Sequence, residues 1–199
     1  MIKAKVKLTG VSPFSPCKHI HEEKPAKEPW GDWEKRTWRE KMHFDEDGWV
    51  FIPGMMIKNC LSESAKYNSD KVEGKGHATY TKHFEAGVMV EDNSLIKAIG
   101  KGNKETKINK KDVGFEWVFV PSNGERGGSQ RVDKCFPIIP KGWVAEVDVV
   151  ILDETITKEI FEKTIKNAGS FIGIGRWRPR NNGMNGRFLA EILSWKKED

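Results

Sequence analysis

Residues 142–195 restrict the fold more than any other part of this sequence, because the spacing of their apolar residues changes from that of a strand to that of a helix and back. The segment GWVAEVDVVIL, residues 142–152, is rich in valine, as buried strands are. In residues 153–169 apolar side chains recur at helical spacing. The alternating segment RFLAEILSW, residues 187–195, predicts a closing strand. This order indicates a mixed α/β domain.

Both ends of the helix in residues 153–169 carry residue types that cap helices. Asp153 or Thr155 is expected at the N-terminus, where a side-chain oxygen accepts a hydrogen bond from a free N–H group of the first turn. Gly169 is expected to end the helix, because glycine adopts the left-handed conformation of a C-terminal cap without strain.

The same two periods occur earlier in the chain. Strand patterns cover residues 2–8, 49–52, 78–92 and 115–121, and helical patterns cover 54–67 and, more weakly, 31–40. The lysine-rich residues 101–111 are expected to be a loop. Without insertions, the order strand, helix, strand, strand, helix, strand predicts an α+β fold of the ferredoxin-like (RRM-like) type, an antiparallel sheet with two helices on one face. We expect one domain, residues 1–199, with large insertions at about 11–48 and 68–141.

Composition excludes several classes of protein. No apolar run approaches the roughly 20 residues of a membrane-spanning helix, and the N-terminal MIKAKVKLTG lacks the apolar core of a signal peptide. The cysteines Cys17, Cys60 and Cys135 are odd in number and widely spaced, so we expect no disulfide framework. These features indicate a cytoplasmic protein without membrane contact.

Residues 173–187, GIGRWRPRNNGMNGR, are the most basic segment, and we call them the Gly-Arg loop. Glycine allows a flexible backbone to approach a ligand closely, and arginine matches phosphate oxygens. Four arginines without a nearby acidic residue repel each other unless an anion is bound, so the loop indicates an anionic polymer as ligand. Its candidate contact residues are Gly173, Gly175, Arg176, Trp177, Arg178, Arg180, Asn181, Asn182 and Arg187.

A second anion site is expected where residues 49–52 lead through Pro53 into the helix of residues 54–67. The first N–H groups of a helix are unpaired and its dipole is positive there. Gly54 and Met55 would present these N–H groups, and Lys58, one turn later, would reach the same anion.

Together the two motifs resemble the RAMP superfamily, the repeat-associated proteins that form CRISPR effector complexes. The family motif IPGSSLKG stands here as IPGMMIKN, residues 52–59, and the glycine-rich loop stands as Gly173-Ile174-Gly175 followed by GMNG, residues 183–186. Two serines of the motif are Met55 and Met56 here, and its last glycine is Asn59, so hydroxyl contacts to phosphate are lost.

The resemblance implies a backbone-type subunit that binds single-stranded, guide-like RNA, within such a ribonucleoprotein or as a mobile-element mimic that interferes with one. It implies self-association or assembly with related RAMP-like subunits. It also implies a thumb hairpin, here residues 115–137, with Arg126 and Arg131 near its tip. Binding would be mostly to phosphates, and we expect neither catalysis nor a cofactor.

Two other readings of the residues remain open. A metal-dependent endoribonuclease would use a loop aspartate, for which Asp32, Asp45 and Asp47 are candidates. A protein-interaction module would present the basic loop to an acidic partner. A zinc site at Cys17, His19 and His21 is not expected, because no second pair of ligands with suitable spacing completes it.

The eight tryptophans divide into two groups. Trp49, Trp117, Trp143 and Trp195 fall in strand patterns and are expected in the core. Trp30, Trp33, Trp38 and Trp177 lie beside cationic residues, where an aromatic face can stack on an unpaired base. Trp177 is the first candidate, because it lies inside the Gly-Arg loop.

Overall fold

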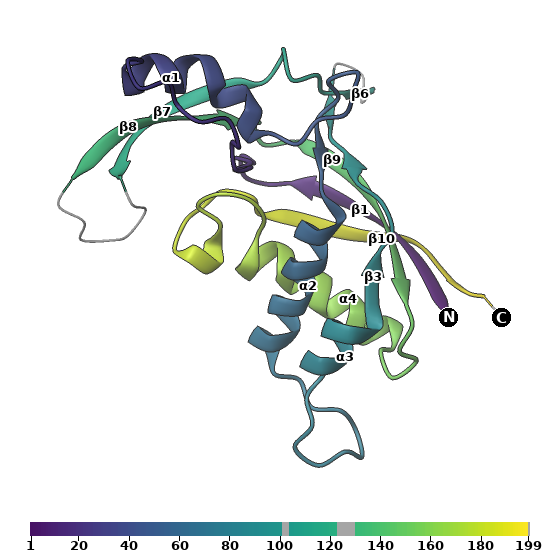
Figure 1. Cartoon of the computed structure of the whole chain (residues 1–199). Coiled ribbons are helices and arrows are strands. Elements are labelled where there is room, and N and C mark those ends of the chain that lie inside the picture. The colour runs from purple at the N-terminus through teal and green to yellow at the C-terminus, as the bar shows by residue number, and fades with distance from the viewer. Residues whose placement is uncertain (101–103, 123–129, 199) are drawn as a thin grey trace.

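A computed structural model describes residues 1–100, 104–122 and 130–198 (Figure 1). Its main sheet contains β1 (Ile2–Gly10), β9 (Trp143–Ile151) and β10 (Phe188–Lys197), in the order β10-β1-β9. The shorter strands β3 (Val88–Val90) and β5 (Lys97–Ile99) both pair with β9, and β6 (Glu105–Lys107) pairs with β5. Every strand pair among the described residues is antiparallel. The expected loop at 101–111 therefore contains a strand in its described part, because residues 105–107 extend the sheet.

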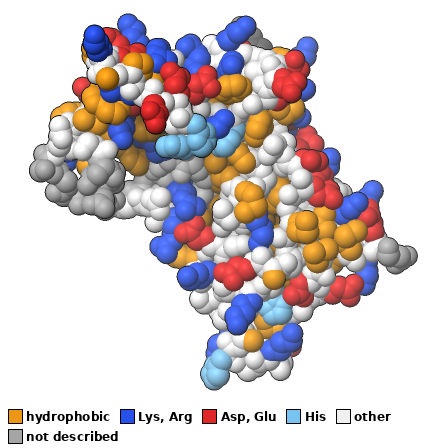
Figure 2. Space-filling view, viewed as in Figure 1, with side chains coloured by type: hydrophobic (Ala, Val, Ile, Leu, Met, Phe, Trp, Pro, Cys, Tyr) orange, Lys and Arg blue, Asp and Glu red, His pale blue; other side chains and the backbone are white. Residues whose placement is uncertain are grey.

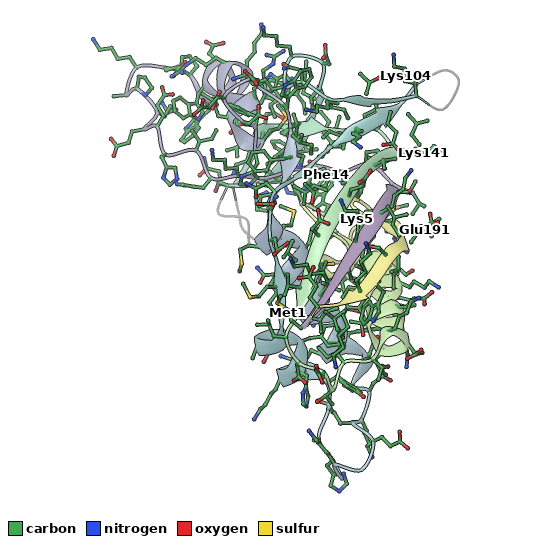
Figure 3. All side chains as sticks on the ribbon, turned by 90° about the vertical axis from the view of Figure 1, so that its right-hand side faces the viewer. Met1, Lys5, Phe14, Lys104, Lys141 and Glu191 are labelled. Carbon is green, nitrogen blue, oxygen red and sulfur yellow. The ribbon has the colours of Figure 1, made fainter. Side chains whose placement is uncertain are left out.

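The alternation in β1 separates a buried face of the sheet from an open one. Ala4, Val6 and Leu8 point into the core. The lysines between them lie on the open face, which Figure 3 shows with Lys5 and Glu191 labelled. Each lysine has an acidic partner there: Lys3 pairs with Glu198, Lys5 with Asp148 and Lys7 with Glu105, at 3.0, 3.4 and 2.7 Å between nitrogen and oxygen. The open face is therefore close to neutral along β1.

Helices cover the other face of the sheet (Figure 1). α2 (Gly54–Asn68) and α4 (Lys158–Asn167) agree with the expected helices and bury Ile57, Leu61, Phe161 and Ile165. α3 (Thr81–Gly87) replaces the first part of the strand expected at 78–92, of which only β3 is extended. Its last turn is held by Lys58, whose ammonium group donates to the carbonyl oxygens of Phe84 and Glu85 at 2.6 and 2.9 Å. No pattern of neighbouring residues in the sequence predicts this contact.

The caps expected for α4 are wrong. Thr157 caps the helix, because its hydroxyl oxygen accepts a hydrogen bond from the N–H group of Ile160. Gly169 lies inside a π-helical turn, Ala168–Ile172, that continues α4. A Cβ atom at this glycine would lie 2.0 Å from the carbonyl oxygen of Phe188, so the glycine lets β10 pass close to the turn.

Asp153 instead joins α3 to the segment before α4. His83 Nδ1 lies 2.5 Å from Asp153 Oδ2, and the Thr155 N–H group donates to Oδ1 at 2.9 Å. Burial acts to raise the pKa of Asp153, but these hydrogen bonds outweigh it and lower the pKa to about 2. Because the folded-state pKa lies below the ordinary value of 3.8, this stabilisation is present above about pH 4 and is lost as the pH falls toward 2.

Replacing Asp153 by asparagine is therefore expected to lower the free energy of unfolding at pH 7 by on the order of 1–2 kcal/mol and to flatten its decline between pH 4 and pH 2. Urea unfolding at several pH values measures both effects. Asp148→Asn, on the open face of the sheet, is the control. Parallel pH profiles for the wild type and Asp153→Asn would contradict the assignment.

A second layer is built from the segments between these elements. β7 (Gly114–Pro121) and β8 (Arg131–Ile138) pair over eight residues and form a two-stranded sheet of their own. α1 (Trp30–Thr37) and the 3-10 turn η1 (Trp38–Lys41) pack on β8. β2 (Phe51–Ile52) pairs with β4 (Ser94–Leu95). In Figure 1 the hairpin β7–β8 extends away from the main sheet, above the loop between α4 and β10.

A buried ion pair joins α1 and η1 to this hairpin. Lys41 Nζ lies 2.5 Å from Glu34 Oε2, and both side chains are less than a tenth exposed. The same oxygen accepts from the Cys135 N–H group, and the Lys41 ammonium donates to the Cys135 carbonyl oxygen, both at 2.8 Å. The pair therefore satisfies the backbone of β8 as well as its own charges.

Candidate nucleic-acid interface

The Gly-Arg loop is a folded segment packed on the domain. The Ile174 N–H group donates to the Gly186 carbonyl oxygen, and the Asn185 N–H group donates to the Trp177 carbonyl oxygen, at 3.1 and 2.9 Å. The Gly186 N–H group donates to Pro13 at 2.7 Å, which ties the loop to the chain after β1. The expectation of a flexible backbone is therefore wrong, because the glycines allow these close approaches.

Gly183 shows most directly what a side chain would do in the loop. A Cβ atom at Gly183 would lie 1.9 Å from the Trp177 carbonyl oxygen, which no folded loop tolerates. We expect Gly183→Ala to lower the free energy of unfolding by about 1–3 kcal/mol. Gly31→Ala in α1 is the matched control, because nothing lies within 4 Å of its Cβ position. Equal unfolding midpoints for the two variants would contradict the close packing of the loop.

Arg176 is the most enclosed arginine of the loop. Its side chain is 9% exposed, its Nε donates to the Ser15 hydroxyl at 3.1 Å, and its Nη2 donates to Glu116 on β7. The guanidinium carbon lies 4.1 Å from the ring centre of Phe136 and 4.3 Å from that of Trp177. Burial lowers the pKa of Arg176, and Glu116 opposes this shift. Arg176 thus joins the Gly-Arg loop to the hairpin.

Arg178 and Arg180 share one carboxylate on α2. Arg178 Nη1 lies 2.9 Å from Glu63 Oε2, and Arg180 Nε lies 2.9 Å from Glu63 Oε1. The expectation that the loop arginines have no counter-charge is therefore wrong, because α2 and β7 supply Glu63 and Glu116. Arg187 is exposed, and its N–H group donates to the Ser12 hydroxyl at 2.9 Å.

The start of α2 offers fewer free donors to an anion than the sequence predicted. The Gly54 N–H group donates to the Asn93 side chain at 3.3 Å, while the Met55 side chain is 65% exposed. Lys58 was expected to bind the same anion, but its ammonium group is used within the fold. It donates to two carbonyl oxygens of α3 and, at 2.9 Å, to the Ser62 hydroxyl. Burial also lowers the pKa of Lys58.

α2 meets the loop through one side of the helix instead. Met56, Asn59 and Glu63 follow each other at spacings of three and four residues, so they lie on one face. Met56 and Asn59 line a hollow of about 440 Å³, whose opposite side is formed by Gly175, Arg176, Trp177, Arg178 and Asn181. Asn182, in left-handed conformation, ends the short 3-10 turn that contains Asn181.

A second hollow, of about 510 Å³, lies on the hairpin side of the same loop residues. Arg176, Trp177 and Asn181 line both hollows, and we call the two together the loop groove. Trp177 is 45% exposed and has a left-handed backbone with φ of 52°, which is unusual for a residue with a side chain. The hairpin residues of the groove are Phe119, Val120, Pro121, Arg131, Lys134 and Phe136.

Figure 2 shows Lys and Arg side chains gathered below the hairpin, with acidic atoms among them. Of the two arginines expected near the tip of the hairpin, Arg131 lines the same groove as the Gly-Arg loop. Arg126 lies outside the described residues. Sequence reasoning missed Lys134, Phe136, Asn59 and Glu63. The helical spacing of Asn59 and Glu63 from Met56 was the one signal that could have pointed to the last two.

The other candidates do not assemble into a site. Asp32 is exposed in the first turn of α1, and Asp45 accepts from the Trp49 N–H group in a turn that also contains Asp47. Among the described residues, no three His, Cys, Asp or Glu side chains lie close enough together to hold a metal ion. No helix in the described ranges is both long and apolar enough to cross a bilayer.

The expected division of the tryptophans is partly wrong. Trp143 is buried, but Trp117 is 44% exposed because its hairpin stands outside the main sheet. Trp33 and Trp38 are buried, because they hold α1 and η1 on the hairpin. Trp30 and Trp177 remain exposed, at 61% and 45%.

Comparison with known proteins gives a fold but no close relative. No family model matches the chain, and no curated protein matches it in sequence. A chain in the cryo-EM structure of the Type III-B Cmr-beta bound to cognate target RNA aligns with a TM-score of 0.54 and 13% identity, over 98% of this chain and 60% of that one. This chain thus spans three fifths of that neighbour.

The crystal structure of Cmr6 from Pyrococcus furiosus aligns with a TM-score of 0.50 and 14% identity, over 96% of this chain and 99% of that one. At 13% and 14% identity, both matches are likenesses of fold. The resemblance expected from the sequence is therefore confirmed at the level of the fold.

Proposed function

We propose that this protein binds single-stranded RNA in the loop groove, as a subunit of a CRISPR-type ribonucleoprotein. The observation that carries the proposal is the convergence of Arg178, Arg131 and Lys134 around the half-exposed Trp177. Arg180 lies beside Arg178, because both pair with Glu63. Cations beside an aromatic face suit a strand whose phosphates are accessible and whose bases are unpaired. Because phosphate contacts carry no sequence information, binding is expected to be largely independent of sequence.

The open face of the sheet is a less favourable site for RNA than the loop groove. RNA-recognition domains stack bases on aromatic residues of such a face. Here β1, β5 and β9 present lysine and acidic residues, and Lys5 of β1 pairs with Asp148 of β9, as Lys97 of β5 does with Glu146 of β9. Where lysines are already paired with carboxylates, as Lys3, Lys5 and Lys7 are, a polyanion gains little.

The finer fold assignment and the thumb belong to the same proposal. We read β1, α2, β3, β9, α4 and β10 as the ferredoxin-like core, since β10, β1, β9 and β3 pair in that order. The hairpin β7–β8 is the thumb, and its exposed Phe115 and Trp117 supply the contact to a neighbouring copy or a related subunit.

The test is a titration of labelled single-stranded RNA with the purified protein, at several salt concentrations and with a duplex of the same sequence as control. We expect preference for the single strand and an affinity that falls steeply with salt. Equal affinity for both forms would contradict the groove as a single-strand site. Magnesium in one arm addresses the nuclease alternative, which requires cleavage of the bound strand.

A further inference from the structure

Glu63 lies on α2 at the edge of the loop groove and pairs with two arginines that a phosphate group would need. Each oxygen of its carboxylate lies 2.9 Å from a different arginine of the loop, Arg178 or Arg180. Glu63 and Arg178 are about three-quarters buried, while Arg180 is half-exposed. The carboxylate therefore bridges two guanidinium groups at the edge of the groove.

A phosphodiester presents the same chemistry to these arginines. Carboxylate and phosphate both offer two oxygens to the guanidinium fork, so they compete for the same N–H groups. Arg176 is in a different situation, because its side chain is 9% exposed and bound to Ser15 and Glu116. A phosphate reaching the loop from solvent thus meets Arg178 and Arg180 with Glu63 already in place.

The helix offers Glu63 a second cation. Lys66 follows it by three residues on α2, which places the two side chains side by side on the helix surface. Glu63, Lys66, Tyr67 and Arg180 line one hollow of about 450 Å³. Glu85 lines the same hollow, so a displaced Glu63 carboxylate can turn toward Lys66 on the helix surface and away from Glu85.

We propose that Glu63 is an internal counter-ion that occupies the phosphate subsite of Arg178 and Arg180 in the free protein and is displaced when RNA binds. The proposal rests on the proposed RNA-binding function. Glu63 holds the two arginines together before binding and lowers the affinity of the groove for isolated anions. A strand that makes several contacts at once displaces it, so Glu63 favours extended polyanions over single phosphate groups.

The test compares Glu63→Gln with the wild type, using a labelled single-stranded oligouridylate and fluorescence anisotropy. Glutamine keeps the size of the side chain and removes its charge. We expect Glu63→Gln to bind about tenfold more tightly and to show a salt slope steeper by about one ion, because phosphate then meets unpaired arginines. Inorganic phosphate is expected to inhibit this variant at lower concentration than the wild type. Glu162→Gln, on α4 and paired with Lys166, is the control.

The failures of the two proposals are distinguishable. Unchanged or weaker RNA binding by a folded Glu63→Gln, with normal binding by the wild type, would show that Glu63 only positions the arginines and would overturn the counter-ion role. A wild type that does not bind RNA would overturn the proposed function and this inference with it. Thermal unfolding identifies a folding defect, and Glu63→Ser, which is also uncharged, repeats the measurement in that case.

Discussion

Glu34→Gln is expected to lower the free energy of unfolding by about 3–5 kcal/mol, because it leaves the Lys41 ammonium buried without its counter-charge. Lys41 is 8% exposed and has the Cys135 carbonyl oxygen as its other acceptor. Glutamine can still accept from the Cys135 N–H group, so the lost term is the charge. Urea denaturation of the wild type and the variant measures the difference.

The location of the damage can be tested with the cysteines. Cys17 is exposed, while Cys60 and Cys135 are buried, and burial raises the pKa of their thiols to about 12 and about 11. A thiol reagent is therefore expected to modify Cys17 in the folded wild type. In Glu34→Gln it is expected to modify Cys135 as well, since the hairpin loses its support, while Cys60 stays protected.

A double-mutant cycle separates the charge from the packing. Adding Lys41→Met to Glu34→Gln removes the unpaired buried cation. The double variant is therefore expected to lose less free energy of unfolding than the two single variants lose together. Strictly additive losses, or a Glu34→Gln variant with wild-type stability, would show that the pair does not hold α1 and η1 on β8.

Replacing both Arg178 and Arg180 by alanine is expected to weaken single-stranded RNA binding by about 10- to 100-fold. Each guanidinium contributes charge-assisted hydrogen bonds to phosphate, and the displacement of Glu63 offsets part of that gain. The matched control is Lys3→Ala with Lys5→Ala, which removes two positive charges from the open face of the sheet. Anisotropy titrations of both double variants measure the effect.

The control decides between a site and a general charge effect. If both double variants lose affinity equally, net charge rather than the loop groove governs binding. Arg176 is left in place in this experiment, because its contacts with Ser15 and Glu116 make its loss a structural change.

The elements with long regular patterns were predictable from sequence. β1, α2, β9 and β10 follow the spacing of their apolar residues, because each buries one face against the same core. α3 was not predictable, since seven residues with one buried aromatic side chain carry no clear period and the helix depends on Lys58 from α2. The hairpin at residues 115–137 was expected only from the family resemblance, because alternation reveals a strand but not its partner.

Part of the candidate site was likewise predictable from the sequence, and part was not. The Gly-Arg loop stands out in the sequence, because its composition differs from the rest of the chain. Its arginines find Glu63 and Glu116 through contacts across 117 and 60 positions of the chain, which local patterns do not report. The same holds for Lys58, whose residue type suggested an anion ligand although its hydrogen bonds are all within the fold.

The salt dependence of single-stranded RNA affinity measures how many phosphate contacts the Gly-Arg loop makes. In the wild type, the logarithm of the dissociation constant is expected to rise linearly with the logarithm of salt concentration. The Arg178→Ala/Arg180→Ala variant is expected to give a slope smaller by about one to two ions, because two phosphate contacts are lost and part of their effect is already cancelled by Glu63. Identical slopes for the wild type and this variant would contradict a phosphate-binding role for the Gly-Arg loop.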